Sequence, residues 1–130
     1  MPAKYEFEAQ WRALGTDVTG TLTGIGSGKQ NTEIIITKLA EFGVTNKAAA
    51  QRCAKLSFNG YDDWFLPSKD ELHLMYTKLH KKGVGGFFYN TYWSSSQKGD
   101  YDASAYSFED GSETDNSKDT TKGVRPCRAF

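Results

Sequence analysis

The chain has 130 residues, of which 38% are hydrophobic and 14% aromatic, which is enough for one domain with one core and too little for two. Sixteen basic residues balance sixteen acidic ones, and this zero formal charge argues against a nucleic-acid-binding protein. The sequence has no run of eighteen apolar residues and no hydrophobic signal core, so we expect neither membrane insertion nor self-directed secretion.

The N-terminal half predicts a loop followed by two helices. Residues 1–10 are expected to be a partial strand or a flexible segment, and the Gly- and Thr-rich stretch 11–29 predicts a loop over the core. Asn31 is a good cap, apolar residues follow at helical spacing and Gly43 can end the helix, which predicts a first helix over residues 31–41. A second helix is predicted from about residue 45 to Asn59-Gly60.

The C-terminal half predicts one helix and then strands. Ser68 and Glu71 have the spacing of a capping box, so a third helix is expected over residues 69–81, ending at Gly83. Strands are expected at 91–94, 103–108, 112–116 and 123–130, with a turn at Asp110-Gly111. Helices therefore precede strands, which predicts an α+β fold with helices packed on a twisted antiparallel sheet. The expected core residues are Trp64, Phe65, Leu66, Leu72, Met75, Trp93, Phe108, Val124 and Phe130.

The segment Gly24-Ile25-Gly26-Ser27-Gly28-Lys29 precedes a helix, where phosphates often bind. It does not match the Walker loop, because Thr23 stands where that loop needs Gly and Gln30 stands where it needs Ser or Thr. It does not match the dinucleotide-binding motif either, because Lys29 stands at the position of the third Gly. We expect a structural glycine loop.

Other candidate groups also have structural explanations. His73 and His80 would lie roughly 10 Å apart on one helix, too far to share a metal ion, and are expected to pack or face solvent. Asp62 and Asp63 point in opposite directions if extended, and are expected to bind loop amides. Ser94-Ser95-Ser96 lacks a nucleophile elbow, so capping or sheet-edge hydrogen bonds are expected. The sequence predicts no catalytic residue, no metal, no cofactor and no enzyme.

Cys53 and Cys127 are too few for a disulfide scaffold, and their 74-residue separation fits no zinc motif. A bridge would close most of the domain, but two buried thiols are the favoured interpretation.

Residues 97–121 hold seven acids and two bases, Lys98 and Lys118, for a local net charge of −5. Short polar residues and Tyr between apolar ends are typical of a paratope, although composition supports an ordinary solvated hairpin about equally. Acidity argues against anionic partners, including nucleic acid, and is compatible with neutral or basic ones. The candidate ligand-binding residues are Tyr101, Asp102, Ser104, Ser107, Glu109, Ser112, Thr114, Asp115, Asn116, Ser117, Asp119 and Thr120.

Longer motifs carry a resemblance that covers nearly everything after Trp11. They are the run from Asn59 through Trp64-Phe65-Leu66-Pro67-Ser68 to Leu72, then Gly85-Gly86-Phe87, Tyr92-Trp93-Ser94-Ser95-Ser96, and the ending Val124-Arg125-Pro126-Cys127-Arg128-Ala129-Phe130. They resemble the family of the C-terminal domain of the Legionella collagen-like adhesin. The stretch from Trp93 to Phe130 is also similar to the variable region of proteins diversified by retroelements, in which mutagenesis rewrites scattered ligand-facing positions.

The resemblance implies a single C-type lectin-like domain over residues 1–130, akin to formylglycine-generating-enzyme-like domains. It implies a non-enzymatic variable protein that displays its C-terminal side chains to a protein or cell-surface ligand, as part of a larger assembly at a virion or cell surface. It also implies that Cys53 and Cys127 are neighbours. Calcium and sugar signatures of calcium-dependent lectins are missing, so neither activity carries over.

Two alternatives stay open: an adhesin module that binds sulfated glycans, and an enzyme with a reactive cysteine. The sequence departs from the family at Cys127, where Val is usual, and at Ser104, near a common aromatic position. The strand that precedes the Gly-Thr loop is expected to be absent or reduced to Tyr5-Glu6-Phe7, which puts closure of the sheet edge in doubt.

Overall fold

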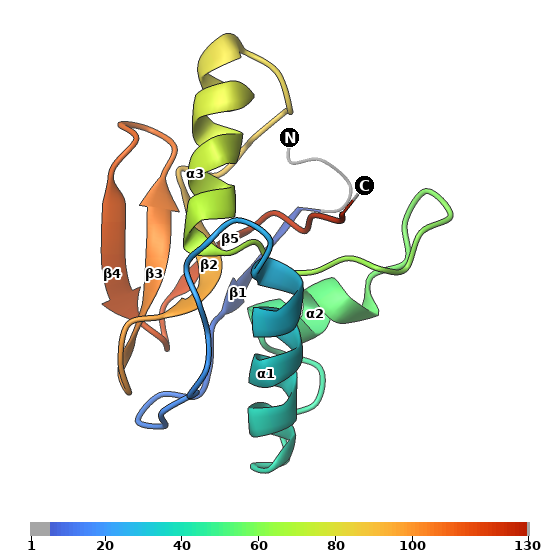
Figure 1. Ribbon diagram of the computed structural model, residues 1–130, viewed down its shortest axis with the longest axis vertical. Helices are drawn as coiled ribbons and strands as arrows, with labels where there is room; N and C mark the ends of the chain where they lie inside the picture. Colours follow the sequence, from blue (N-terminus) through green and yellow to red (C-terminus); the bar gives the residue numbers. More distant parts are fainter. Residues whose placement is uncertain (1–5, 130) are drawn as a thin grey trace.

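The computed structural model describes residues 6–129. Over these residues the elements are β1 (Phe7–Gln10), α1 (Gly28–Ala40), α2 (Ala49–Lys55), α3 (Lys69–Lys78), the 3-10 helix η1 (His80–Lys82), β2 (Thr91–Gln97), β3 (Asp102–Ser107), β4 (Glu113–Ser117) and β5 (Thr121–Val124). The predicted α+β fold is confirmed (Figure 1).

The strands form one sheet in the order β1-β5-β2-β3-β4 (Figure 1). Three pairings are antiparallel, but β2 and β5 pair in parallel, with Tyr92 opposite Gly123. The prediction of an antiparallel sheet is therefore wrong at this pairing, because β5 is inserted between β1 and β2 instead of extending the hairpins. A Cβ at Gly123 would lie 2.6 Å from the Cβ of Tyr89, so the approach requires glycine.

The N-terminal strand covers Phe7–Gln10 instead of the expected Tyr5-Glu6-Phe7, of which Tyr5 lies outside the described residues, and it closes one edge of the sheet. β1 pairs with β5 from Phe7 opposite Val124 to Gln10 opposite Thr121. The buried Glu6 carboxylate, just before β1, pairs with Arg125 at 2.6 Å and accepts a hydrogen bond from the Tyr92 hydroxyl at 2.9 Å. The doubt about edge closure is thus removed.

Helices cover both faces of the sheet, and each face has its own core. Alternating residues of β2 and β3 divide between the two cores, since successive side chains of a strand point to opposite faces. Trp93, Ala103 and Ala105 pack with buried residues of α1 and α2. Tyr92 and Tyr106 pack with Leu72 of α3. The central strands are consequently buried on both sides.

The first two helices begin at other residues than predicted. α1 begins at Gly28, because Asn31 is buried inside the helix, where its side chain bonds the Leu22 amide at 2.8 Å and the Leu22 carbonyl at 2.7 Å. α2 is only seven residues long. The Gln51 side chain accepts a hydrogen bond from the Ala48 amide at 3.1 Å, which fixes the start, and Leu56 is already extended.

The capping box that begins α3 is confirmed. The Glu71 side chain accepts from the Ser68 amide at 2.8 Å, and the Ser68 hydroxyl accepts from the Glu71 amide at 3.3 Å. The helix ends at Lys78, three residues earlier than predicted, and continues as η1 up to Gly83, whose φ of +75° ends it.

Six of the predicted core residues are buried: Phe65, Leu66, Leu72, Trp93, Phe108 and Val124. Met75 packs at the edge of the α3 core, and Trp64 is partly exposed, with its indole donating to the Tyr61 carbonyl at 3.0 Å. Phe130 lies outside the described residues.

Candidate ligand-binding surface

The β3–β4 hairpin exposes its edge strand and its turns. β3 lies between β2 and β4, and Ala103 through Tyr106 are all buried. β4 is an edge strand whose residues are exposed or half-buried. Any partner of this region therefore meets β4 and the turns, and acidic side chains on such an edge also oppose pairing with another strand.

The prediction that residues 97–121 are exposed is wrong for the interior of β3, including the candidate Ser104, and for Lys118. Ser104 is 2% exposed because α3 covers this face of β3, and its carbonyl accepts from the Ser94 hydroxyl at 2.7 Å. Ser104 cannot touch a partner in this structure. The exposed candidates are Tyr101, Glu109, Ser112, Asp115, Asp119 and Thr120, and the half-buried ones are Asp102, Ser107, Thr114, Asn116 and Ser117.

The candidates divide between two opposite ends of the hairpin. We define the Lys118 end as residues 97–102 and 117–120, and the Tyr76 end as residues 107–112, where Gly111 lies against the Tyr76 ring. Five-residue β4 separates the two ends by roughly 17 Å. The structure therefore brings Tyr101, Asp119 and Thr120 to one end, and places Ser107, Glu109 and Ser112 at the other.

Buried Lys118 fixes the backbone at its end. Its ammonium donates to the Thr16 carbonyl at 2.9 Å, the Gln97 side-chain oxygen at 2.8 Å and the Ala13 carbonyl at 3.4 Å. It also lies 4.9 Å from the centre of the Trp11 ring. Burial lowers the pKa of Lys118 to about 8. One side chain thus joins β4, the end of β2 and the loop after β1.

Backbone hydrogen bonds reinforce this junction. The Arg12 amide donates to the Lys118 carbonyl at 3.0 Å, and the Gly15 amide donates to the Asp100 carbonyl at 2.9 Å. Arg12 and Ala13 have φ of 70° and 62°, left-handed conformations that are uncommon for residues other than glycine. Tertiary contacts must hold this loop in place, and its bond from Gly15 to Asp100 supports the turn that carries the exposed Tyr101.

The roles of Lys118 and Gln97 are not evident from the sequence. Lys118 was expected among the displayed charges, because no local pattern distinguishes it from exposed Lys98. The Gln97 side-chain oxygen accepts a hydrogen bond from the Val18 amide at 2.6 Å, and its side-chain nitrogen donates to the Asp17 carboxylate at 2.7 Å. With Lys118 used internally, the outward charge of residues 97–121 is dominated by acids.

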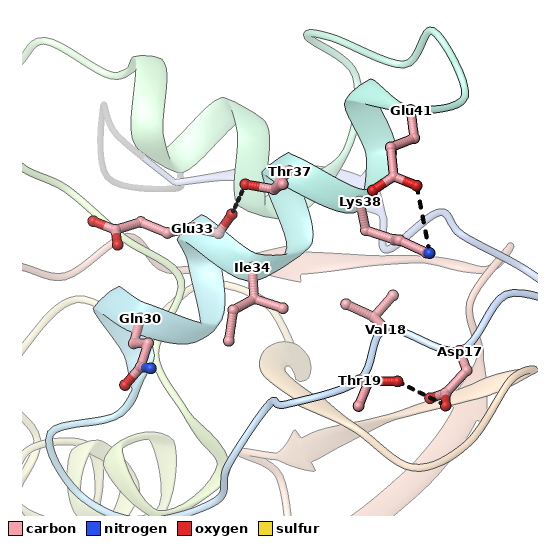
Figure 2. Close-up of a pocket in the computed structure, with 9 residues that line it drawn as sticks. All are labelled: Asp17, Val18, Thr19, Gln30, Glu33, Ile34, Thr37, Lys38 and Glu41. Atoms are coloured by element: carbon pink, nitrogen blue, oxygen red, sulfur yellow. Dashed lines mark hydrogen bonds and ion pairs between the residues drawn. The ribbon is translucent and has the colours of Figure 1, made fainter.

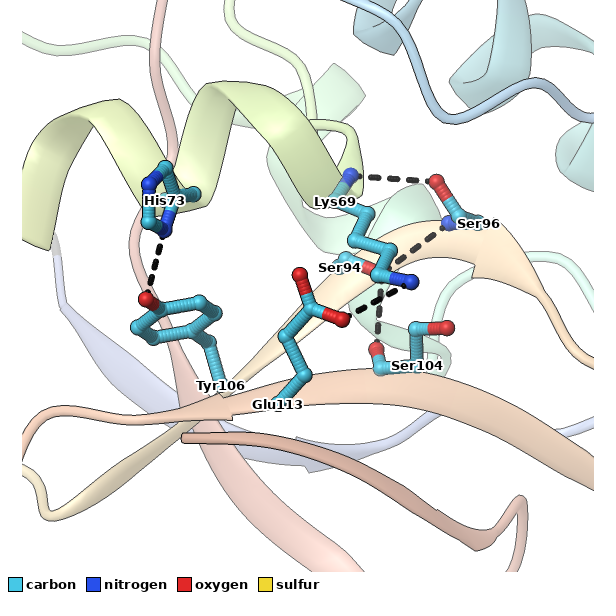
Figure 3. Close-up of polar contacts among 7 residues, drawn as sticks. All are labelled: Lys69, His73, Ser94, Ser96, Ser104, Tyr106 and Glu113. Carbon is cyan, nitrogen blue, oxygen red and sulfur yellow. Dashed lines mark hydrogen bonds and ion pairs between the residues drawn. The ribbon is translucent and has the colours of Figure 1, made fainter. Parts of the chain in front are cut away.

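The helix side of the hairpin is crossed by polar contacts (Figure 3). Lys69, at the start of α3, pairs with Glu113 of β4 at 2.9 Å, and this hydrogen bond raises the pKa of Lys69. His73 Nδ1 and the Tyr106 hydroxyl share a hydrogen bond of 2.6 Å. These contacts hold β4 against α3.

The three serines have the structural role that was expected. They lie where the β2–β3 register is irregular, between Trp93 and Gln97. The Ser96 hydroxyl accepts from the Lys69 amide at 3.0 Å, which caps α3 (Figure 3), and the Ser95 hydroxyl accepts from the Asn31 amide group at 3.1 Å.

The remaining motifs also have structural roles. The Glu71 carboxylate accepts from the Gly26 amide at 3.0 Å and the Gly28 amide at 3.1 Å, so a side chain of this chain occupies the place a phosphate would take. The glycine loop is therefore structural, as predicted. His80 stacks near Phe87 and Phe108, which confirms a packing role.

The main interaction of Asp63 differs from the predicted one. It forms a two-pronged pair with Arg128 at 2.6 and 3.0 Å, and this hydrogen bond lowers the pKa of Asp63. The expected binding of loop amides is not its main interaction.

A cleft of about 420 Å³ adjoins the Lys118 end, between α1 and residues 17–19 (Figure 2). Most of its lining residues have polar side chains, with Asp17 held by Thr19 at 2.9 Å and Lys38 paired with Glu41 at 3.5 Å, while Val18 and Ile34 add apolar surface. Asp17 connects the cleft to Gln97 and so to Lys118. The Lys118 end therefore offers exposed side chains beside a hollow.

Neither cysteine forms a disulfide, and burial raises the pKa of both thiols, that of Cys127 well above its ordinary value. A charge on Cys53 would raise the pKa of Cys127 further, as expected of groups that lie near each other. Within residues 6–129 no cluster of three His, Cys, Asp or Glu residues could hold a metal ion. The helices described here are all too short or too polar to cross a membrane.

Comparison with known proteins supports the resemblance drawn from the motifs. The profile of one family, described as the Lcl C-terminal domain, matches residues 10–128. A search of curated proteins found no match. The family assignment indicates an adhesin-like domain.

Proposed function

The chain belongs to the Lcl C-terminal domain family, and we propose that it is a non-enzymatic recognition domain that binds a protein or cell-surface ligand through the Lys118 end of its hairpin. The contacts would come from Tyr101, Asp102, Asp119 and Thr120, with the adjoining cleft beside α1 as a flank. An acidic surface of this kind suits a neutral or basic partner.

The observation that carries this proposal is the buried Lys118. A binding surface gains affinity when its backbone is rigid before the partner arrives. Here the rigidity comes from an internal ammonium and from backbone hydrogen bonds, while Tyr101, 65% exposed, contributes little to the core. Outward side chains can then change without refolding the turns.

We further propose a C-type lectin-like fold and an origin as the variable protein of a diversity-generating retroelement. The pairing of the first described strand with the last, and helices on both faces of the sheet, support the fold. The split between inward and outward residues of the hairpin supports the origin. A genome that holds a reverse transcriptase gene beside a near-copy of the tail's coding sequence, differing at adenines, is expected. A locus without such a copy would contradict that origin.

Enzymatic chemistry through a reactive cysteine finds no support. A nucleophilic thiol needs a lowered pKa and access to solvent. Burial raises the pKa of Cys53 and Cys127, and Cys53 is fully buried. This environment favours two structural thiols.

A displayed library tests the recognition proposal. We would randomise Tyr101, Asp102, Asp119 and Thr120 on yeast and select against lysozyme, a defined basic protein. A control library would randomise the exposed residues Phe42, Thr45, Asn46 and Lys47, which follow α1 and do not line the cleft. Binders are expected from the first library only. Equal enrichment from both, or none from the first, would contradict the proposed surface.

The sulfated-glycan alternative rests on a separate observation. Lys78, Lys81 and Lys82 are exposed at the end of α3, outside the acidic hairpin. If they bind heparin, retention should fall steeply with salt and be lost in Lys81→Gln/Lys82→Gln. A variant with Asp119→Asn should retain it. Absence of salt-sensitive retention removes this alternative.

A further inference from the structure

A second hollow lies on the face of α3 that points away from the sheet. It has a volume of about 630 Å³, and its wall is formed by residues of α3, of the glycine loop and of the segment 127–129. Four wall residues of α3, Glu71, Leu74, Met75 and Lys78, and its C-cap Leu79 are spaced i, i+3, i+4, i+7 and i+8, which places them along one side of the helix. The side of α3 that faces the sheet carries His73 and Tyr76, which contact Tyr106 of β3.

The wall of this pocket is mainly apolar. Leu74 and Met75 are half-buried, whereas Leu79 is 39% and Ile25 is 67% exposed. Burial raises the pKa of the Cys127 thiol, so the thiol is uncharged and adds to the apolar wall. Contiguous exposed apolar surface that forms a concave site is typical of ligand binding.

Some of the charged groups around the pocket are already paired within the chain, and others are not. Both Glu71 oxygens accept hydrogen bonds from backbone amides of the glycine loop and of the α3 cap. Arg128 is paired with Asp63. Among the described residues, Lys29 and Lys78 have no carboxylate within ion-pair distance. The pocket therefore offers a hydrocarbon surface with two available cations.

We propose that this pocket binds a small amphiphilic carboxylate, with its hydrocarbon body against Leu74, Met75 and Leu79 and its carboxylate attracted by both Lys29 and Lys78. The volume falls within the range of roughly 300–1,000 Å³ that is usual for small-molecule sites. This site is independent of the hairpin, from which α3 separates it.

Titration with decanoate, followed by amide chemical shifts of the ¹⁵N-labelled chain, tests the proposal. Shifts are expected in α3, in the glycine loop and at residues 127–129, and not at the Lys118 end. Lys29→Gln and Lys78→Gln should each weaken decanoate binding about threefold, as for a partly exposed charge pair. Lys81→Gln, one turn further along and outside the pocket wall, should not change it.

A neutral ligand separates the apolar contribution from the charge. Binding of 1-decanol should be unaffected by Lys78→Gln and weakened by Leu74→Gln, which weakens decanoate as well. Each variant is checked by its circular dichroism and unfolding midpoint, so that a loss of fold is recognised. Three results would overturn the proposal: shifts centred on the hairpin, equal effects of Lys78→Gln and Lys81→Gln, or self-association of the chain through this face of α3 in sedimentation.

Discussion

Replacing Lys118 by Met should unfold the Lys118 end more easily while changing no exposed contact. The substitution removes two good hydrogen bonds from the ammonium, at 2.8 and 2.9 Å, and a weaker one at 3.4 Å. Hydrogen bonds to charged groups contribute about 1.5–3 kcal/mol each, and burying the ammonium offsets part of this. The Gln97 side-chain oxygen still accepts from the Val18 amide, whereas the part-buried Thr16 carbonyl loses the ammonium as its donor. We expect a net loss of about 2–3 kcal/mol.

Urea denaturation followed by tryptophan fluorescence measures this loss, with Lys98→Met as the matched control. Lys98 is exposed on the same hairpin, so its substitution should stay within about 0.5 kcal/mol of the parent. Hydrogen exchange should also become faster at the Arg12 and Gly15 amides, which the junction protects. A Lys118→Met variant as stable as the parent would refute the claim that this ammonium holds the turns together.

The stability difference between the parent and Lys118→Met should also depend on pH, and the direction of that dependence tests the account. The folded-state pKa of Lys118, about 8, lies below the ordinary value of 10.5. Between these two values the unfolded chain binds more protons than the folded chain, so the contribution of Lys118 to stability rises with pH. The stability difference between parent and Lys118→Met should therefore be larger at pH 9.5 than at pH 7.5. A smaller difference at the higher pH would mean that the folded state favours the ammonium.

Three further changes are expected to have distinct effects. Gly28→Ala would place a Cβ 2.2 Å from the Glu71 carboxylate and should destabilise the chain by about 1–3 kcal/mol in urea, whereas Gly24→Ala has open space and should be nearly neutral. Glu6→Gln breaks a buried ion pair and should lower stability by about 3–5 kcal/mol, with exposed Glu8→Gln as its control. Ser104→Tyr should lower the thermal midpoint, because an aromatic ring does not fit at a position that is 2% exposed.

Local signals predicted local structure well. The capping box at Ser68 and Glu71 fixed the start of α3, because both partners lie within four residues. The glycine loop was also predicted correctly as structural, although its partner is Glu71, 43 residues from Gly28. Asn31 shows the limit: its cap-like sequence context competed with buried hydrogen bonds to Leu22, and the tertiary bonds prevailed.

Long-range packing determines which side chains of the hairpin are buried, and local sequence patterns do not reveal this. Ser104 and Asp115 are opposite each other in the β3–β4 register, yet one is buried and the other exposed. The difference comes from α3 and from the position of β4 at the sheet edge. Lys118 reads as a surface charge, and only the fold brings Thr16 and Gln97 around its ammonium. The candidate ligand-binding residues likewise form one continuous segment in the sequence, although the fold places them at opposite ends of the hairpin.

Saturation mutagenesis of residues 97–122, with display level on yeast as the measure of folding, tests the central claim most directly. The claim is that inward residues set the backbone and outward residues are free to vary. Tyr101, Asp115, Asp119 and Thr120 should then accept most substitutions, whereas Ala103, Ala105 and Lys118 should accept few. Outward positions as intolerant as these buried ones would contradict the account.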